Sequence, residues 1–140
     1  MKTNIFTTKC LEAFKFLVDE FNFELMETKG DLAYSHVTYH NKTLSLGITI
    51  YYEYGENYVY VNLFKSIDGA LPQWNDRVNQ IDLNSFVPAN FPPCNLPIVY
   101  PQMYSEADLA NVLKSHGDAL RQYGKKILNG DVSIFSKNRH

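Results

Sequence analysis

Between residues 33 and 64 apolar and polar side chains alternate, and this alternation constrains the fold more than any other feature of the sequence. A period of two places successive side chains on opposite faces of a β-strand. Three long antiparallel strands are therefore predicted at 33–40, 43–52 and 58–64, and a shorter strand is predicted at 23–28. The two-residue turn at 41–42 predicts a register in which Tyr39 faces Leu44.

The alternation gives the predicted sheet two different faces. The aliphatic face carries Val37, Tyr39, Leu44, Leu46, Ile48, Ile50, Val59, Val61 and Leu63. The opposite face is rich in rings, because Tyr34, His36, Tyr51, Tyr58 and Tyr60 fall on it. Gly47 falls on this second face, opposite His36 in the predicted register, and we expect a neighbouring ring to cover its missing side chain.

Helical periodicity flanks the strands on both sides. Residues 8–21 predict one helix with an apolar stripe that includes Leu11, Phe14, Leu17, Val18 and Phe21. A second helix is predicted from Ser105, which caps it together with Asp108, to a stop at Gly130. Two helices packed on the aliphatic face define the predicted fold class, an α+β two-layer sandwich with an antiparallel β-meander of about four strands.

The chain of 140 residues has the length of a single domain, so we predict one α+β domain over 1–140. Five of the six prolines lie between residues 88 and 101. Proline removes a backbone donor and fixes φ, which excludes a regular helix or a central strand there. We therefore expect the segment 87–101 to be an ordered crossing loop, because its apolar residues are too many for a free linker.

Charge and composition exclude several classes of function. The net charge is −2, and Lys42 is the single cation in the predicted strands 33–64, so nucleic-acid binding is not expected. No apolar run is long enough to span a bilayer, and charges interrupt the N-terminal segment where a signal peptide needs an apolar core. Two cysteines are too few for a disulfide framework, which favours a reducing, cytoplasmic location.

The titratable residues do not form a recognisable catalytic or metal-binding pattern. His36 and His40 share one face, but four strand residues span about 13 Å, too far for one metal ion. No cofactor-binding motif is present, so we predict no cofactor and no metal. Cys10, near a helix start, is a candidate nucleophile if a histidine lies beside it, but a buried structural thiol is the favoured interpretation. No catalytic residue is predicted.

The class of function that remains is recognition of another molecule by the protein surface. The candidate residues for this recognition are aromatic. Tyrosine and tryptophan supply large contact areas at low entropic cost. The predicted partner-binding residues are Tyr34, His36, Tyr51, Tyr58, Tyr60 and Trp74. We call the first five of these the tyrosine face. The sequence leaves open whether the 65–104 segment covers this face. It also leaves open a homodimer, and a small-molecule pocket lined by Trp74, Phe91 and Tyr100.

The C-terminal sequence LRQYGKKILNGDVSIF has the pattern L-x-x-Y-x-x-x-I-L-x-G-D followed by an apolar pair. With a first helix that ends in EFNF and a tyrosine-rich meander, the chain resembles small bacterial immunity proteins. The resemblance covers the first 65 and the last 30 residues, and it transfers no contact residue. It implies a cytosolic, non-enzymatic protein that binds another protein, a toxin, and neutralises it.

Overall fold

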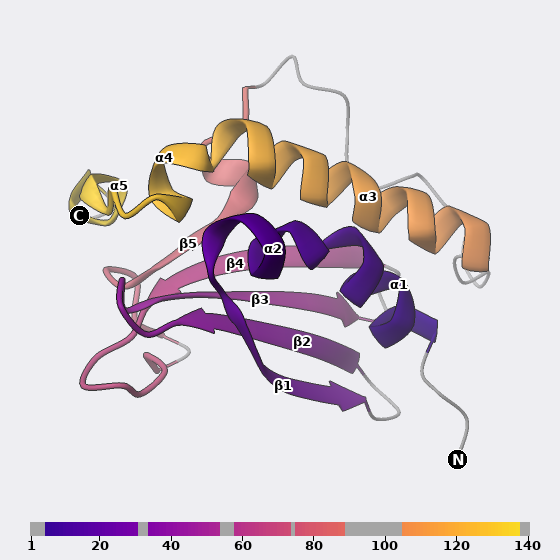
Figure 1. The fold of residues 1–140 in the computed structure, drawn as a ribbon, viewed down its shortest axis with the longest axis horizontal. Helices are drawn as coiled ribbons and strands as arrows, with labels where there is room; N and C mark the ends of the chain where they lie inside the picture. Colours follow the sequence, from indigo (N-terminus) through magenta and orange to yellow (C-terminus); the bar gives the residue numbers. More distant parts are fainter. Residues whose placement is uncertain (1–4, 31–33, 54–57, 74, 89–104, 138–140) are drawn as a thin grey trace.

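The computed structural model describes residues 5–30, 34–53, 58–73, 75–88 and 105–137 (Figure 1). The elements follow in the order α1 (Ile5–Ala13), α2 (Lys15–Phe21), β1 (Glu24–Gly30), β2 (Tyr34–Asn41), β3 (Leu46–Glu53), β4 (Tyr58–Lys65), β5 (Gln80–Asp82), a 3-10 turn (Leu83–Ser85), α3 (Glu106–Tyr123), α4 (Lys125–Leu128) and α5 (Ser133–Lys137). The five strands form one antiparallel sheet in the order β1-β2-β3-β4-β5. The predicted α+β class is correct, with one strand more than expected.

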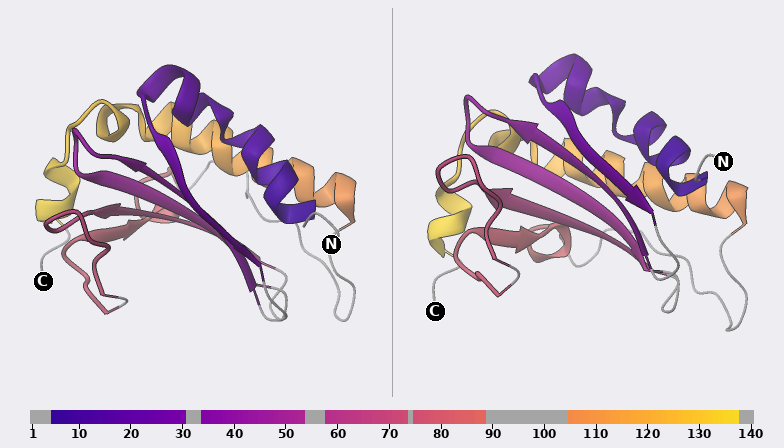
Figure 2. Two further views of the ribbon diagram at one scale, coloured as in Figure 1. Left: turned by 60° about the horizontal axis from the view of Figure 1, so that its bottom comes forward. Right: turned by 90° about the horizontal axis from the view of Figure 1, so that it is seen from below.

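The helices cover a single face of this sheet. In Figure 1, α1, α2 and α3 lie above the strands, and α1 and α3 run side by side in the same direction. Two ion pairs join the helices at either end, Lys9 with Glu106 at 3.6 Å and Arg121 with Glu20 at 2.7 Å. The opposite side, which we call the outer face of the sheet, has no helix against it in the described part of the chain (Figure 2).

The core lies between the helices and the aliphatic face of the sheet. Its buried strand residues are Val37, Tyr39, Leu46, Ile48, Ile50, Tyr52, Val59, Val61, Leu63 and Ile81. Its buried helical residues include Phe6, Cys10, Phe14, Leu17, Leu109, Val112, Leu113, Leu120, Ile127 and Leu128. The period-two pattern therefore selected the aliphatic core face correctly, because alternate side chains of a strand point to the same face.

The N-terminal helix differs from its prediction in extent and continuity. It begins at Ile5 and is interrupted at Phe14, whose backbone (φ −109°, ψ 14°) leaves helical geometry. Phe14 itself is fully buried, while Val18 is 43% exposed and does not belong to the inward stripe. The buried residues of this region are Phe6, Cys10, Phe14 and Leu17, so a continuous stripe over 8–21 that includes Val18 was the wrong description.

The predicted register between β2 and β3 is also wrong, by four residues. Tyr39 pairs with Ile48, and the turn spans four residues, Lys42 to Ser45, instead of two. Ser45 takes a positive φ of 52° in this turn, which removes Leu44 from the strand. A shift by an even number of residues keeps every side chain on its predicted face. The assignment of strand residues to the two faces is therefore correct although the register is not.

Gly47 consequently lies opposite His40 and not His36. The expectation of a covering ring is confirmed, since the ring of Phe64 on β4 occupies the space where a Cβ would project from Gly47. The rings of His40 and Phe64 are stacked, with centroids 6.4 Å apart and planes 6° apart. The missing side chain thus allows two cross-strand rings to pack over the backbone of β3.

The region after β4 contains the strand β5, which the sequence pattern did not reveal. Only three residues pair, and they add a short edge to β4 through Leu63 and Ile81. The predicted proline-rich crossing at 87–101 lies outside the described residues apart from positions 87 and 88.

The C-terminal helix begins as predicted, because Ser105 Oγ accepts a hydrogen bond from the Asp108 amide at 3.1 Å. It is not continuous to Gly130, since a break at Gly124 separates α3 from α4. Gly130, with φ 106°, ends α4 as expected, and the buried Phe135 anchors the last short helix.

Candidate functional site

The strand register assembles the tyrosine face on the outer face of the sheet. Tyr51 lies between His36 on β2 and Tyr60 on β4. In the next row, Glu53 lies between Tyr34 and Tyr58. The five predicted residues on the strands are therefore brought together as two adjacent rows, with one carboxylate in the middle of the second row.

The rings of these rows are in direct contact. Tyr34 stacks on His36 with centroids 6.0 Å apart and planes 16° apart. His36 meets Tyr51 at 5.7 Å, and Tyr58 meets Tyr60 at 4.6 Å. The His36–Tyr51 contact joins two strands, whereas the other two join neighbours along one strand. Such aromatic pairs stabilise a sheet and fix the orientation of each ring. The ring positions are thus set before any partner binds.

A hollow of about 430 Å³ opens between these rings, lined by Tyr34, His36, Tyr51, Glu53 and Tyr60. The three tyrosines are partly exposed and Glu53 is exposed. The described segments 65–73 and 75–88 do not cross this end of the sheet. The loop after β4 lies at the other end, where β2 turns into β3 (Figure 2). Within the described chain, the tyrosine face is therefore open.

His36 is largely enclosed in the hollow, with 14% of its side chain exposed. Its Nδ1 atom is buried and has no hydrogen-bond partner in the described part of the structure. Its Nε2 atom lies 3.5 Å from Glu27 Oε1 on the neighbouring edge strand. Burial raises the pKa of Tyr51, and the nearby Tyr34 and Glu27 add to that increase. Tyr51 therefore stays a neutral phenol at physiological pH.

Acidic side chains predominate on the outer face. The register places Glu24, Glu27 and Lys29 of β1, Glu53 of β3 and Asp82 of β5 on the same face as the tyrosines. Lys29 is the single lysine or arginine among these strand positions. Sequence reasoning missed Glu27, because only the pairing of β1 with β2 brings it to His36.

The other residues that the sequence singled out lie either outside the described part of the chain or in the core. Trp74, Phe91 and Tyr100 lie outside the described residues, and so does the small-molecule pocket that they were expected to line. Cys10 is fully buried in the core, and burial raises its pKa far above the ordinary thiol value. A nucleophilic cysteine needs the opposite shift and access to substrate, so the thiol is a packing residue, as the favoured interpretation held.

A serine and a histidine meet at the other end of the outer face. His40 Nε2 lies 3.0 Å from Ser66 Oγ, beside a hollow of about 460 Å³. A serine nucleophile requires a base that is oriented by a third group. Among the described residues no carboxylate forms an ion pair with His40, and burial and Lys42 lower its pKa. The pair ties β2 to the loop that follows β4.

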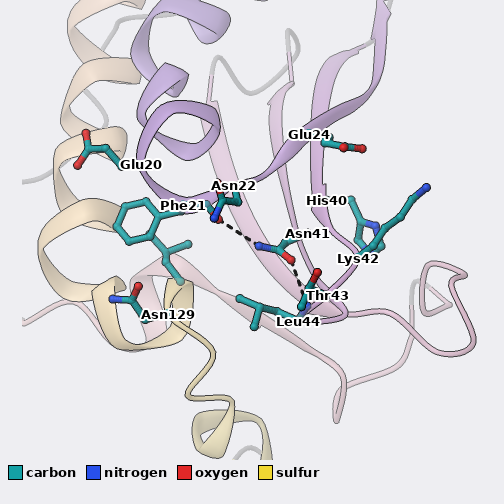
Figure 3. A pocket seen from close by; sticks show the side chains of 11 residues that line it. Glu20, Phe21, Asn22, Glu24, His40, Asn41, Lys42, Thr43, Leu44 and Asn129 are labelled. Carbon is teal, nitrogen blue, oxygen red and sulfur yellow. Dashed lines mark hydrogen bonds between the residues drawn. The ribbon is translucent and has the colours of Figure 1, made fainter.

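A further hollow of about 340 Å³ lies where α2, the β2–β3 turn and α4 converge (Figure 3). Its central side chain, Asn41, donates from Nδ2 to the Phe21 carbonyl and accepts at Oδ1 from the Leu44 amide, both at 3.1 Å. Figure 3 shows Glu20 and Lys42 on opposite sides of this hollow. Both polar atoms of this central amide already have partners within the fold, where they hold the turn.

Within the described residues no group of three or more histidines, cysteines, aspartates and glutamates is arranged to hold a metal ion. None of the helices in that part of the chain combines the length and hydrophobicity needed to traverse a bilayer. No protein-family model, curated protein or solved structure matches this chain. The functional argument therefore rests on the geometry of the tyrosine face.

Proposed function

We propose that this chain is a non-enzymatic protein-binding module whose partner is a toxin that it neutralises. The observation that carries the binding part is the open hollow of about 430 Å³, around which three strands hold the tyrosine rings. The C-terminal pattern that resembles immunity proteins is what suggests a toxin as the partner.

The physical support comes from how protein interfaces are built. Their energetic centres are enriched in tyrosine, tryptophan and arginine, which fill pockets with rings that lose little entropy on binding. The ring contacts of His36 with Tyr34 and Tyr51 hold this surface in place in the free protein. A surface that is ordered in advance loses less conformational entropy when the partner binds.

The experiment is affinity capture with matched variants. Wild-type protein, a Tyr58→Ser/Tyr60→Ser variant and a Tyr123→Ser control are immobilised, and lysate of the source organism is passed over each at moderate salt. Tyr123 lies on α3, in the helical layer, so its loss removes a tyrosine without touching the outer face. Circular dichroism and thermal melting establish that all three proteins are folded.

One stoichiometric protein retained by the wild type and the control, and lost by the double variant, is the expected result. Retention on all three proteins would contradict the tyrosine face as the binding surface. The toxin part is tested by expressing the retained protein alone. Growth arrest that co-expression of this chain relieves supports neutralisation, and unimpaired growth contradicts it.

A further inference from the structure

We propose that the hollow of the tyrosine face receives an arginine side chain of the partner protein. The guanidinium would stack on a tyrosine ring and donate hydrogen bonds to Glu53. This inference rests on the proposed protein-binding function and adds the chemistry that recognises the partner. It is argued from three features: an arginine site inside the chain, the carboxylate of Glu53 in the hollow, which has no ion-pair partner among the described residues, and the charge of the outer face.

The chain already contains one site that holds an arginine in this manner. The guanidinium carbon of Arg121 lies 5.7 Å from the centroid of the Phe16 ring. The same guanidinium donates from Nη2 to Glu20 Oε1 at 2.7 Å. An aromatic face and a carboxylate together satisfy both properties of a guanidinium, its flat weakly hydrated surface and its outward N–H donors. This pairing joins α2 to α3.

The hollow presents the same two components, aromatic rings and a carboxylate. Glu53 lies in register between Tyr34 and Tyr58, and the ring of Tyr51 lines the same space. Among the described residues no lysine or arginine forms an ion pair with Glu53. The hollow is about 430 Å³ in volume and open to solvent, so a long side chain of another protein can enter it.

Lys29 is the internal cation that must be considered. It pairs with His36 on the edge of the sheet and so lies on the same face as the hollow. It makes no ion pair with Glu27 or Glu53 in the described structure, although it is close enough in register to compete. A variant without this charge therefore shows whether the chain's own lysine weakens binding in the hollow.

The charge of the outer face favours a basic partner. The strand positions of this face carry the four carboxylates of Glu24, Glu27, Glu53 and Asp82 against the one charge of Lys29. A second copy docked face to face would bring these carboxylates together, which is unfavourable. Arginine is preferred to lysine because its planar group can stack on a ring and donate to a carboxylate at the same time.

The test is a titration of the isotopically labelled protein, followed by NMR of its backbone amides and aromatic rings. N-acetyl-argininamide is the probe, and N-acetyl-citrullinamide, its neutral counterpart of nearly equal shape, is the control. The wild type is compared with Glu53→Gln, with Lys29→Met and with Glu12→Gln. The last of these removes a carboxylate in the helical layer and matches the charge change at position 53.

We expect saturable shifts at Tyr34, Tyr51 and Tyr60 with the arginine probe, at a roughly millimolar Kd for so small a ligand. Binding weakens by a factor of about 5 or more in Glu53→Gln, because one charge-assisted contact is lost, and it is unchanged in Glu12→Gln. Citrulline gives no saturable shift. Lys29→Met binds the probe at least as tightly as the wild type.

Shifts that do not saturate, or that are equal for citrulline and arginine, overturn the proposal. Binding that appears only in Lys29→Met also overturns it, since the chain's own lysine then fills the hollow. The titration needs no partner, so its failure leaves the capture experiment and the proposed function standing. If capture fails while the probe binds, the arginine site remains and the proposed function falls.

Discussion

Gly117 of α3 lies against the backbone of Ala13 in α1, so closely that a Cβ on Gly117 would be 2.8 Å from the Ala13 carbonyl oxygen. Glycine in a helix interior costs about 1 kcal/mol relative to alanine, and the sequence alone marks this position as a weak point. The contact explains the glycine. It lets two helices that run in the same direction approach closely above the sheet.

We therefore expect Gly117→Ala to destabilise the protein despite the gain in helix propensity. A carbonyl oxygen in a packed helix cannot move aside as a flexible side chain can, so the two helices must separate. Overpacking of this kind costs about 1–3 kcal/mol, which exceeds the propensity gain of about 1 kcal/mol. Urea unfolding measures the change, with Gln122→Ala on the exposed side of α3 as the control. Greater stability of Gly117→Ala than of wild type would contradict the close contact.

Gly47 and Phe64 should be strongly coupled. The ring of Phe64 occupies the position that a Cβ on Gly47 would take, so Gly47→Ala must displace a buried ring. We expect a loss of about 1–3 kcal/mol in the free energy of unfolding. In a Phe64→Ala background the same substitution meets no ring and costs less. A double-mutant cycle gives the coupling, and strictly additive effects would show that the ring does not pack over Gly47.

The stability of the protein should fall in mildly acidic solution, in part because of His116. This residue is buried in α3, with Nδ1 2.8 Å from the Val112 carbonyl oxygen, and burial lowers its pKa from 6.5. Below pH 6.5 His116 binds a proton in the unfolded chain more readily than in the folded chain, and this difference favours unfolding. The free energy of unfolding is therefore higher at neutral pH and decreases as the pH falls.

Urea unfolding of wild type and His116→Gln at pH 7.5 to 5 measures this effect. Since His116→Gln removes the titrating ring, the decline of stability with pH should be shallower in the variant, by at most about 1.4 kcal/mol per pH unit. His40, whose pKa is also lowered, retains its own contribution in both proteins. An identical pH dependence of the two proteins would mean that His116 titrates normally in the folded state.

Cys10 should be unreactive in the native protein. It has no exposed surface and a raised pKa, so neither access nor thiolate is available. A Cys94→Ser background leaves Cys10 as the one cysteine. Iodoacetamide at pH 8 should label Cys10 readily in urea, where the chain is unfolded, whereas labelling in buffer requires transient unfolding. Native labelling as fast as that of a free thiol would restore the cysteine-enzyme hypothesis.

Within the strands, the pattern of side chains was sufficient to predict which residues face the core and which form the tyrosine face. Alternation is local information, and a strand has only two faces, so Val61 and Tyr60 could be assigned without knowing their neighbours. The cap at Ser105 and the stop at Gly130 were likewise readable, because each depends on a few consecutive residues.

Pairing across the sheet was decided by the tertiary structure. The turn after β2 has four residues because Asn41 uses its side chain to hold both the Leu44 amide and the Phe21 carbonyl of α2. That second contact joins residues 20 positions apart, and no local pattern encodes it. The interruption at Phe14 and the pairing of β5 depend in the same way on what packs against them.

The sequence by itself determined the fold class, the two faces of the sheet and the ring-rich character of the candidate site. The tertiary structure decided that Glu27 reaches His36, that Glu53 lies between tyrosines, and that the described loop after β4 leaves that end of the sheet open. The physical reason is the range of the interactions. Periodicity fixes the side on which a residue lies, while contacts between distant segments fix which residues meet there.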